Sequence, residues 1–457
     1  MISVSGKIWT QQKVNKNLVE KAKQDYGLGD FLSQLIISRN YDISEIYGIH
    51  NNQKLTNIFK DDKDYQKASL IILNSINNNE NICILGDYDV DGACATSLLV
   101  RYFIHINQKH YFYIPDRVAD GYGASKKLFQ KLILKKPKLV IMVDCGSTSN
   151  EAIDYLNKHN IRSIIIDHHE INKPYPKSDV IINPKKEFIK KENSLLCATA
   201  LTYFFIEILV KKTKSNFKIS NFLIYVLLAT ICDVMPLRKI NKIIARNTIS
   251  KFKIQNNLAL NYIFEQYSLK RRLTVDDLGF LIGPIINSGG RLNSSNYGVE
   301  LLSTDNLEII KDRSKKLIAL NNKRKIIEQN ILDKIDFEKI KKENQNVIIY
   351  YKENLNEGLI GIIASRLKDY FNKPSIVITK SNDRLKASAR STSSYNIGYL
   401  IKSLVDNKII DSGGGHNMAA GFSMKKNNLK LLDNFIQNDY LKNNSNKEIS
   451  NKYDFQL

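Results

Sequence analysis

Short apolar runs alternate with helix-length amphipathic stretches between about residues 54 and 234. The runs are rich in β-branched residues and continuous in hydrophobicity, which is typical of strands that helices cover on both faces. The alternation predicts βαβ units and therefore an α/β domain with a parallel sheet. The five predicted strands are Ile82–Gly86, Tyr111–Pro115, Leu139–Asp144, Ser163–Asp167 and Val180–Asn183.

A different pattern follows. Residues Val299 to Glu357 include no Gly or Pro, and apolar residues recur at spacings of three, four and seven, which predicts a long amphipathic helix of about 30 residues. Strands are then predicted at Val347–Tyr351, Ile376–Thr379 and Leu385–Arg390, before a glycine cluster at Gly413–Gly415. We therefore expect a second, smaller α/β domain, joined to the first by the long helix.

Composition indicates a soluble globular protein: 43% of the 457 residues are hydrophobic and 25% are charged. The five cysteines form no C-x-x-C pair, so we expect reduced thiols rather than a zinc site or disulfides. The N-terminus lacks the pattern of a secretory signal. The most apolar segment, Phe222–Leu237, is short for a membrane span and contains Asp233, so we expect no membrane helix and a cytoplasmic protein.

The net charge is strongly positive, since 68 Lys and Arg against 46 Asp and Glu give +22. Such a balance is expected of a protein that approaches polyanions. Because the chain is rich in Lys, Asn and Ile throughout, an AT-rich genome is an equally good explanation. The candidate sites must therefore decide the function.

Acidic residues and histidines follow several predicted strands. Gly86–Gly92 carries Asp87, Asp89 and Asp91 at alternate positions, a spacing that places all three on one side of an extended loop. Alone, this loop could bind calcium or form a simple turn. Further along, Asp144 and the sequence Asp167-His168-His169 end two more strands, and Asp233 lies in an apolar surround.

A single His is more often structural, and a single Asp after a strand is often a helix cap. Together, however, these residues indicate a metal site at the carboxyl edge of the sheet. Asp and His without thiolates suit Mn²⁺ or Mg²⁺. Without a cation, so many carboxylates would repel one another.

In these residues the chain resembles the DHH phosphoesterase superfamily, which is named after the motif found here at Asp167-His168-His169. Within that superfamily it resembles the RecJ family of single-stranded-DNA-specific 5′→3′ exonucleases. The resemblance runs to about Phe422. Its motifs, in order, are Gly86–Gly92, Pro115–Gly123, Val143–Gly146, Asp167–His169, Asn183-Pro184, Asp233–Leu237, Gly283–Arg291, Ala387–Ser391 and Gly413–Gly421.

The resemblance implies a two-metal site that hydrolyses phosphodiesters with a metal-activated hydroxide. It implies that Asp89, Asp91, Asp144, His168 and Asp233 are metal ligands, with Asp144 a bridge between the ions. His169 would sit against the scissile phosphate or complete the metal shell. Asp87 is either a further ligand or a residue that caps the loop and orients Asp89.

Substrate-binding residues are also implied. Arg291, Ser388 and Arg390 would hold the 5′-terminal phosphate, with Gly414, Gly415 and His416 lining the same cleft between the domains. For any one Arg, a surface ion pair is the alternative. The loop around Asp120 is either part of the active-site rim or an ordinary surface turn. Basic residues on the long helix could contact the nucleic-acid backbone. They are Lys315, Lys316, Lys323, Arg324 and Lys325. The default interpretation of these residues is a solvent-exposed helix face.

The implied function is degradation of single-stranded DNA in repair and recombination, with a single-strand-binding protein or a helicase as candidate partners. The expected domains are an N-terminal helical region (1–53), a DHH catalytic domain (54–240), a helical connector (241–343), a DHH-associated substrate-binding domain (344–424) and a polar tail (425–457). Two alternatives are a short-oligonucleotide or cyclic-dinucleotide phosphodiesterase and an inactive DNA-binding scaffold.

Two departures from the family pattern stand out. The family usually has a Trp-His pair where this chain reads Asn354-Leu-Asn-Glu-Gly358, so the contact of that His is absent or replaced. RecJ proteins generally carry a C-terminal OB-fold, whereas this chain ends about 35 residues after the glycine motif. We therefore expect weaker or more salt-sensitive DNA binding, or assistance from another protein.

Overall fold

A computed structural model describes residues 8–42, 45–47, 53–116, 120, 123–186, 191–292, 294–381, 383–444 and 450–453. Part of one predicted motif, namely Arg117–Ala119, Gly121 and Tyr122, lies outside these residues. The chain divides into two compact units, which we call the larger unit (Asn51–Lys323) and the smaller unit (Met1–His50 with Arg324–Leu457). Among the described residues, no helix combines the length and the hydrophobicity that crossing a membrane requires.

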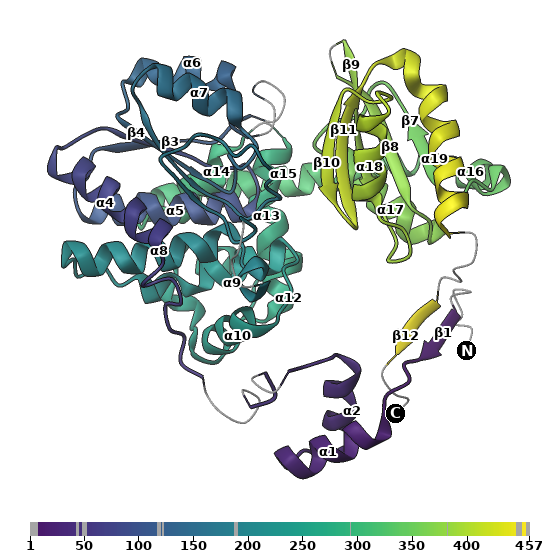
Figure 1. Cartoon of the computed structure of the whole chain (residues 1–457), viewed down its shortest axis with the longest axis horizontal. Helices are drawn as coiled ribbons and strands as arrows, with labels where there is room; N and C mark the ends of the chain where they lie inside the picture. The colour runs from purple at the N-terminus through teal and green to yellow at the C-terminus, as the bar shows by residue number, and fades with distance from the viewer. Residues whose placement is uncertain are drawn as a thin grey trace. The chain divides into compact units, whose positions relative to one another are not determined.

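The larger unit is built on a five-stranded parallel sheet in the order β3-β2-β4-β5-β6 (Figure 1). Its strands are β2 (Ile82–Leu85), β3 (His110–Tyr113), β4 (Leu139–Val143), β5 (Arg162–Ile166) and β6 (Val180–Ile182). All five predicted strands are confirmed, with ends that differ by two residues at most. The parallel sheet is confirmed as well.

Helices cover both faces of this sheet, which explains why its strands are apolar throughout. On one face, Ile84, Ile141 and Ile164 join a core with α4 (Lys63–Asn77), α5 (Val90–His105), α8 (Ala198–Thr213) and α9 (Leu223–Cys232). On the other face, alternate strand residues such as Leu85, Met142 and Ile165 pack against α6 (Lys126–Leu132) and α7 (Asn150–Lys158).

The glycine-free stretch after Val299 is not one continuous helix. It contains the end of α14 (Asn296–Leu302), then α15 (Leu307–Leu332), α16 (Phe337–Glu343) and the strand β7 (Ile348–Tyr351). The long helix is α15, with 26 residues. It is bounded by polar caps: Asn306 accepts hydrogen bonds from the first N–H groups of α15, and Asp336 caps α16.

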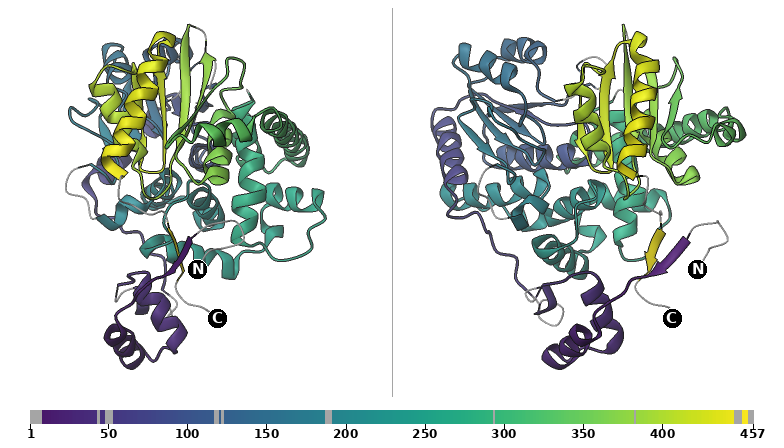
Figure 2. Two further views of the ribbon diagram at one scale, coloured as in Figure 1. Left: turned by 90° about the vertical axis from the view of Figure 1, so that its right-hand side faces the viewer. Right: turned by 45° about the vertical axis from the view of Figure 1, so that its right-hand side comes forward.

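The smaller unit contains a second five-stranded sheet in the order β10-β11-β9-β8-β7, antiparallel except for β7 and β8. The other strands are β8 (Ser375–Ser381), β9 (Arg384–Arg390), β10 (Ser412–His416) and β11 (Ala419–Met424). On one face, α18 (Ile397–Asp406) and α19 (Leu429–Asn444) bury their apolar residues; in Figure 2, the yellow α19 runs beside the strands. Helix α17 (Ile360–Phe371) packs on the opposite face.

The remaining described elements are mostly helical. Within the smaller unit, α1 (Lys16–Tyr26) and α2 (Asp30–Ser38) form a small apolar cluster, and β1 (Ile8–Gln11) pairs in parallel with β12 (Ser450–Tyr453). The larger unit also contains α10 (Lys239–Lys251), α11 (Leu258–Gln266), α12 (Val275–Asp277) and α13 (Gly283–Arg291).

Candidate metal centre and substrate-binding residues

The acidic and His residues that the sequence singled out meet at the carboxyl edge of the parallel sheet. Strand pairing places Leu85 beside Met142 and Met142 beside Ile165, so the loops that follow β2, β4 and β5 leave the sheet at one level. These loops carry Asp87 and Asp89, then Asp144, then Asp167-His168-His169. The end of α9 adds Asp233 to the same group.

Close backbone packing fixes the loop after β2. A Cβ at Gly92, in the first turn of α5, would lie 2.4 Å from the carbonyl oxygen of Asp87, so only glycine allows this approach. The side chain of Asp89 caps α5 by accepting a hydrogen bond from the N–H of Gly92 at 3.0 Å. Asp89 is therefore the N-cap of α5. Asp144 itself has a left-handed backbone, with φ of 59°, a conformation that costs energy for a non-glycine residue.

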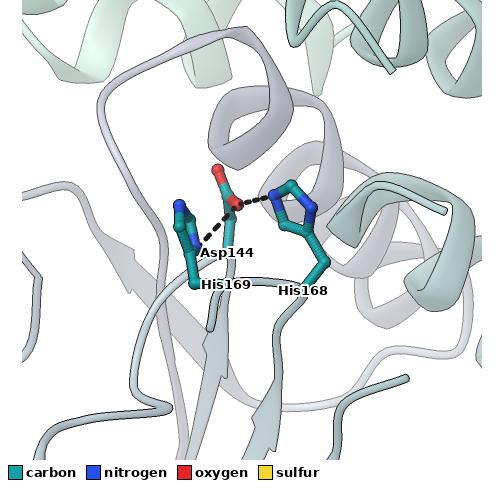
Figure 3. A group of neighbouring side chains, drawn as sticks. All are labelled: Asp144, His168 and His169. Carbon is teal, nitrogen blue, oxygen red and sulfur yellow. Dashed lines mark ion pairs between the residues drawn. The ribbon is translucent and has the colours of Figure 1, made fainter. Parts of the chain in front are cut away.

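His168 is the centre of the cluster. Its Nε2 lies 3.3 Å from Oδ1 of Asp144, 3.5 Å from Oδ2 of Asp233 and 3.6 Å from Oδ2 of Asp91. On the other side of Asp144, Nδ1 of His169 lies 3.8 Å from the same Oδ1 (Figure 3). These side chains come from four separate segments of the chain.

Three groups in this cluster could hold a metal ion, because their ligand atoms lie within 4.8 Å of one another. The groups are Asp144 with His168 and His169, Asp91 with His168 and Asp233, and Asp87 with Asp89 and Asp144. Asp144 and His168 each belong to two groups. All of the predicted metal ligands are therefore brought together, and Asp144 occupies a position from which it could bridge two ions.

Asp91 is held by the start of α8. Its two carboxylate oxygens accept hydrogen bonds from the N–H groups of Ala198 and Thr199, both at 2.7 Å, and from the Thr199 hydroxyl at 2.6 Å. The positive end of the helix dipole favours a carboxylate at this position. Burial nevertheless raises the pKa of Asp91 to about 6, with a contribution from the charge of Asp89.

Burial and mutual repulsion disfavour the ionised forms of the clustered carboxyl groups. Burial raises the pKa of Asp144 well above its usual range, and the charges of Asp91, Asp89 and Asp87 raise it further. The pKa of Asp233 is raised to about 8 by burial and by Asp91. Neither oxygen of Asp144 accepts a hydrogen bond from any residue within the described ranges. Buried, unsatisfied carboxylate oxygens beside an imidazole are a donor set that fits a hard divalent cation.

Asp167 orders this site, although no pattern in the sequence indicates an individual role for it. Its carboxylate accepts hydrogen bonds from the N–H groups of Ser147 at 3.0 Å and His168 at 2.8 Å, and from Nδ1 of His169 at 2.7 Å. Although burial opposes it, this set of donors lowers the pKa of Asp167. In turn, Asp167 raises the pKa of His169 to about 9 against the effect of burial.

The side chain of Asp120 is bonded to the neighbouring strand and helix. This side chain is only 3% exposed and accepts hydrogen bonds from the Tyr113 hydroxyl and the Lys131 ammonium, both at 2.7 Å.

The predicted substrate-binding residues lie in both units. In the smaller unit, Ser388 pairs with Gly421, which pairs with Gly414, and Arg390 pairs with Ala419, which pairs with His416. Because directly paired residues share a face, Ser388, Arg390, Gly414 and His416 lie on one face of the sheet, as expected from their spacing. Gly415 alternates to the other face.

The charged residues among them have specific neighbours. Nη1 of Arg390 lies 3.2 Å from the Ser388 hydroxyl, and a Cβ at Gly361 of α17 would be 3.0 Å from both side chains. In the larger unit, Arg291 ends α13, and a Cβ at the preceding Gly290 would lie 2.3 Å from the carbonyl oxygen of Tyr88. Arg291 therefore follows a tight contact with the loop that carries Asp87 and Asp89. On α15, Lys316 pairs with Asp312 and Arg324 with Glu328.

Comparison with known proteins identifies two family domains in this chain. Residues 81–231 match the DHH family N-terminal domain, and residues 344–441 match the DHHA1 domain. The chain is 29% identical over 382 residues to the single-stranded-DNA-specific exonuclease RecJ of Haemophilus influenzae, covering 79% of this chain and 66% of the relative. It is 28% identical to RecJ of Escherichia coli, covering 80% of this chain and 67% of the relative.

The structural comparison agrees on the fold. RecJ from Thermus thermophilus in complex with Mn²⁺ superposes with a TM-score of 0.80 at 19% identity, covering 98% of this chain and 64% of that protein. Another RecJ bound to manganese gives a TM-score of 0.71 at 22% identity, covering 84% of this chain and 96% of that protein. The chain spans about two thirds of the length of the first relatives and of the Thermus protein.

Proposed function

We propose that this chain, which carries a DHH family N-terminal domain and a DHHA1 domain, is a metal-dependent exonuclease that degrades single-stranded DNA in the 5′→3′ direction. One observation carries the proposal: Asp144 is buried among Asp87, Asp89, Asp91 and His168, and both of its oxygens lack hydrogen bonds from described residues. Such a cluster is costly unless a cation binds it. The RecJ relatives, named as single-stranded-DNA-specific exonucleases, support the choice of substrate.

Two ions, Mn²⁺ or Mg²⁺, would be held by Asp144 together with His168, Asp91 and Asp233 for one ion and Asp87 and Asp89 for the other. When bound, such a pair lowers the pKa of a water and stabilises charge on a phosphodiester undergoing attack. The chain's own contribution is orientation. Asp167 holds the imidazole of His169 through Nδ1, so the N–H at Nε2 can donate to a phosphate oxygen.

Arg390, with Ser388, would bind the phosphate at the 5′ end, since a guanidinium fork matches two phosphate oxygens. Gly414 and His416 lie on the same face of the sheet, and Gly415 would contribute through its backbone. Arg291 would contact the strand close to the metal centre. The protein would degrade single-stranded DNA in the cytoplasm during repair and recombination, with a single-strand-binding protein or a helicase as partner.

The test is a nuclease assay with Mn²⁺ on three labelled substrates: a 5′-phosphorylated single strand, the same sequence as a duplex, and a dinucleotide. We expect short products from the 5′ end of the single strand only, and no products with Asp144→Ala. Preferential cleavage of the dinucleotide would replace the proposal with an oligonucleotide phosphodiesterase. Tight DNA binding without cleavage at any metal concentration would indicate an inactive scaffold.

A further inference from the structure

Helix α13 and the π-helical turn before it, Leu278–Ile282, share one row of side chains that reach the surface. From Ile282 to Gly290 every residue is buried except two, which lie three positions apart. One residue before this range and one residue after it continue the row at spacings of four, so all four side chains lie on the same helix face. We call this row the α13 face, and it consists of Phe280, Pro284, Asn287 and Arg291.

The α13 face borders the candidate metal centre. A Cβ at Gly283 would lie 2.3 Å from Sγ of Cys232, the residue before the candidate ligand Asp233. A Cβ at Gly290 would lie 2.3 Å from the carbonyl oxygen of Tyr88, in the loop that carries further candidate ligands. The residues that directly follow these two glycines belong to the α13 face, which is therefore about 100° around the helix from both contacts. A strand bound along this face would pass beside the metal cluster.

Phe280 gives the α13 face an aromatic end. The residue is 83% exposed, although the glycine before it packs closely: a Cβ at Gly279 would lie 3.2 Å from Cγ2 of Ile231 in α9. The backbone beside Phe280 is therefore held against α9, while its ring is open to solvent. π-Helical turns are frequent at functional sites. Exposed apolar residues that stand alone are common, but this ring shares its helix face with the guanidinium of Arg291.

The two ends of the α13 face match the two parts of a nucleotide chain. Sites for single-stranded nucleic acid combine cationic groups, which contact the phosphates, with aromatic rings, on which the bases stack. Phe280 and Arg291 are eleven residues apart, or about 16 Å along the helix axis. At about 3.4 Å per stacked nucleotide, a dinucleotide is too short to contact both residues, whereas a longer strand can contact both. The spacing therefore fits a polymeric substrate.

We propose that Phe280 stacks on a base of the single strand and that the α13 face guides the strand past the metal centre. This inference rests on the proposed function and deepens it, because it identifies an aromatic residue that contacts the bases. Every base has a π-face, so the contact would be independent of sequence. The bases of a duplex are already stacked between their neighbours, so the ring would favour a single strand.

The experiment measures the Kd of two fluorescent strands of equal length in EDTA, both longer than the α13 face: an ordinary single strand and one with abasic sites throughout. The variants are Phe280→Ala, Phe280→Trp and a matched control, Leu134→Ala. Leu134 is 78% exposed in the same unit, but the neighbouring Lys135 accepts a hydrogen bond from Asn81, the residue before β2, which places it at the amino end of the sheet.

We expect Phe280→Ala to raise the Kd of the ordinary strand about tenfold, the effect of losing one stacked base, and to leave the Kd of the abasic strand unchanged. Phe280→Trp and Leu134→Ala should bind both strands as the wild type does. The KM for cleavage of the ordinary strand in Mn²⁺ should also rise about tenfold for Phe280→Ala, with kcat within about twofold of wild type.

Two controls separate stacking from other effects. Because the ring is exposed, Phe280→Ala should keep the wild-type melting temperature, and a clear fall would place the ring in the packing and overturn the inference. Equal Kd and equal KM values for wild type and Phe280→Ala, or an equal loss on the abasic strand, would overturn it as well while leaving the proposed function intact. A wild-type protein that cleaves no single strand would instead refute the proposed function, and the inference with it.

Discussion

Replacing Asp144 with Asn should shift stability in opposite directions in the absence and presence of metal. Without metal, the wild-type carboxylate is buried, accepts no hydrogen bond from the described residues, and lies among Asp87, Asp89 and Asp91. An unsatisfied buried group of this kind costs about 2 kcal/mol. For a unit of this size, removing the cost should raise the melting temperature by about 4 to 8 °C.

With metal bound, the wild type should instead be more stable than Asp144→Asn. An ion at 1,000 times its dissociation constant stabilises the wild type by about 4 kcal/mol, a gain that the Asn variant largely lacks. The assay is thermal unfolding of both proteins in EDTA and in excess Mn²⁺. Asp167→Asn is the matched control, because Asp167 is equally buried but accepts several hydrogen bonds. It should lower stability in both buffers.

The pH dependence gives the same prediction an independent check. The pKa values of Asp91 and Asp233 are raised to about 6 and about 8, so folding favours their protonated forms. The metal-free wild type should therefore lose stability as the pH rises from about 4, the usual pKa of an Asp, to about 8, and Asp144→Asn should lose less. If Asp144→Asn is less stable than wild type in EDTA at every pH, the conclusion that the carboxylate cluster is a cation-binding site is wrong.

Three further predictions concern other parts of the chain. Gly92→Ala should abolish Mn²⁺ binding in calorimetry, since its Cβ would collide with the backbone of Asp87; wild-type affinity in this variant would contradict the geometry. Arg390→Ala should weaken binding of a 5′-phosphorylated single strand about tenfold or more and leave a 5′-hydroxyl strand nearly unaffected; equal losses would refute the phosphate role. In the native protein, iodoacetamide should label Cys232, which is half-buried, before the buried cysteines; the reverse order, read by mass spectrometry, would contradict the packing at Cys83, Cys94, Cys145 and Cys197.

The sequence predicted the larger sheet well, because strands such as Ile82–Leu85 and Leu139–Val143 are buried on both faces and so carry an uninterrupted apolar signal. Because ligand sites in parallel sheets lie at the carboxyl ends of the strands, the sequence also predicted that Asp144 and His168 lie close together, and the structure confirms this. Local pattern sufficed in both cases.

Contacts between distant segments could not be predicted in the same way. Asp91 is held by Ala198 and Thr199, more than a hundred residues further along the chain, and nothing in the local sequence indicates that contact. The sequence left open whether the loop around Asp120 is part of the active-site rim or a surface turn, because Tyr113 and Lys131, the partners of Asp120, become its neighbours only when β3 and α6 pack together. The apolar periodicity continues past the end of the long helix, so it does not show that α15 ends at Leu332 and that a new helix, α16, starts after its N-cap Asp336.

The most direct measurement is a crystal structure of the protein grown with Mn²⁺, with anomalous data collected at the manganese edge. We predict two anomalous peaks about 3.5 to 4 Å apart. Asp144 should lie between them, and His168 should be within coordination distance. Data without an anomalous peak among Asp87, Asp91, Asp144 and Asp233, from crystals that diffract well in excess Mn²⁺, would contradict the proposed metal centre.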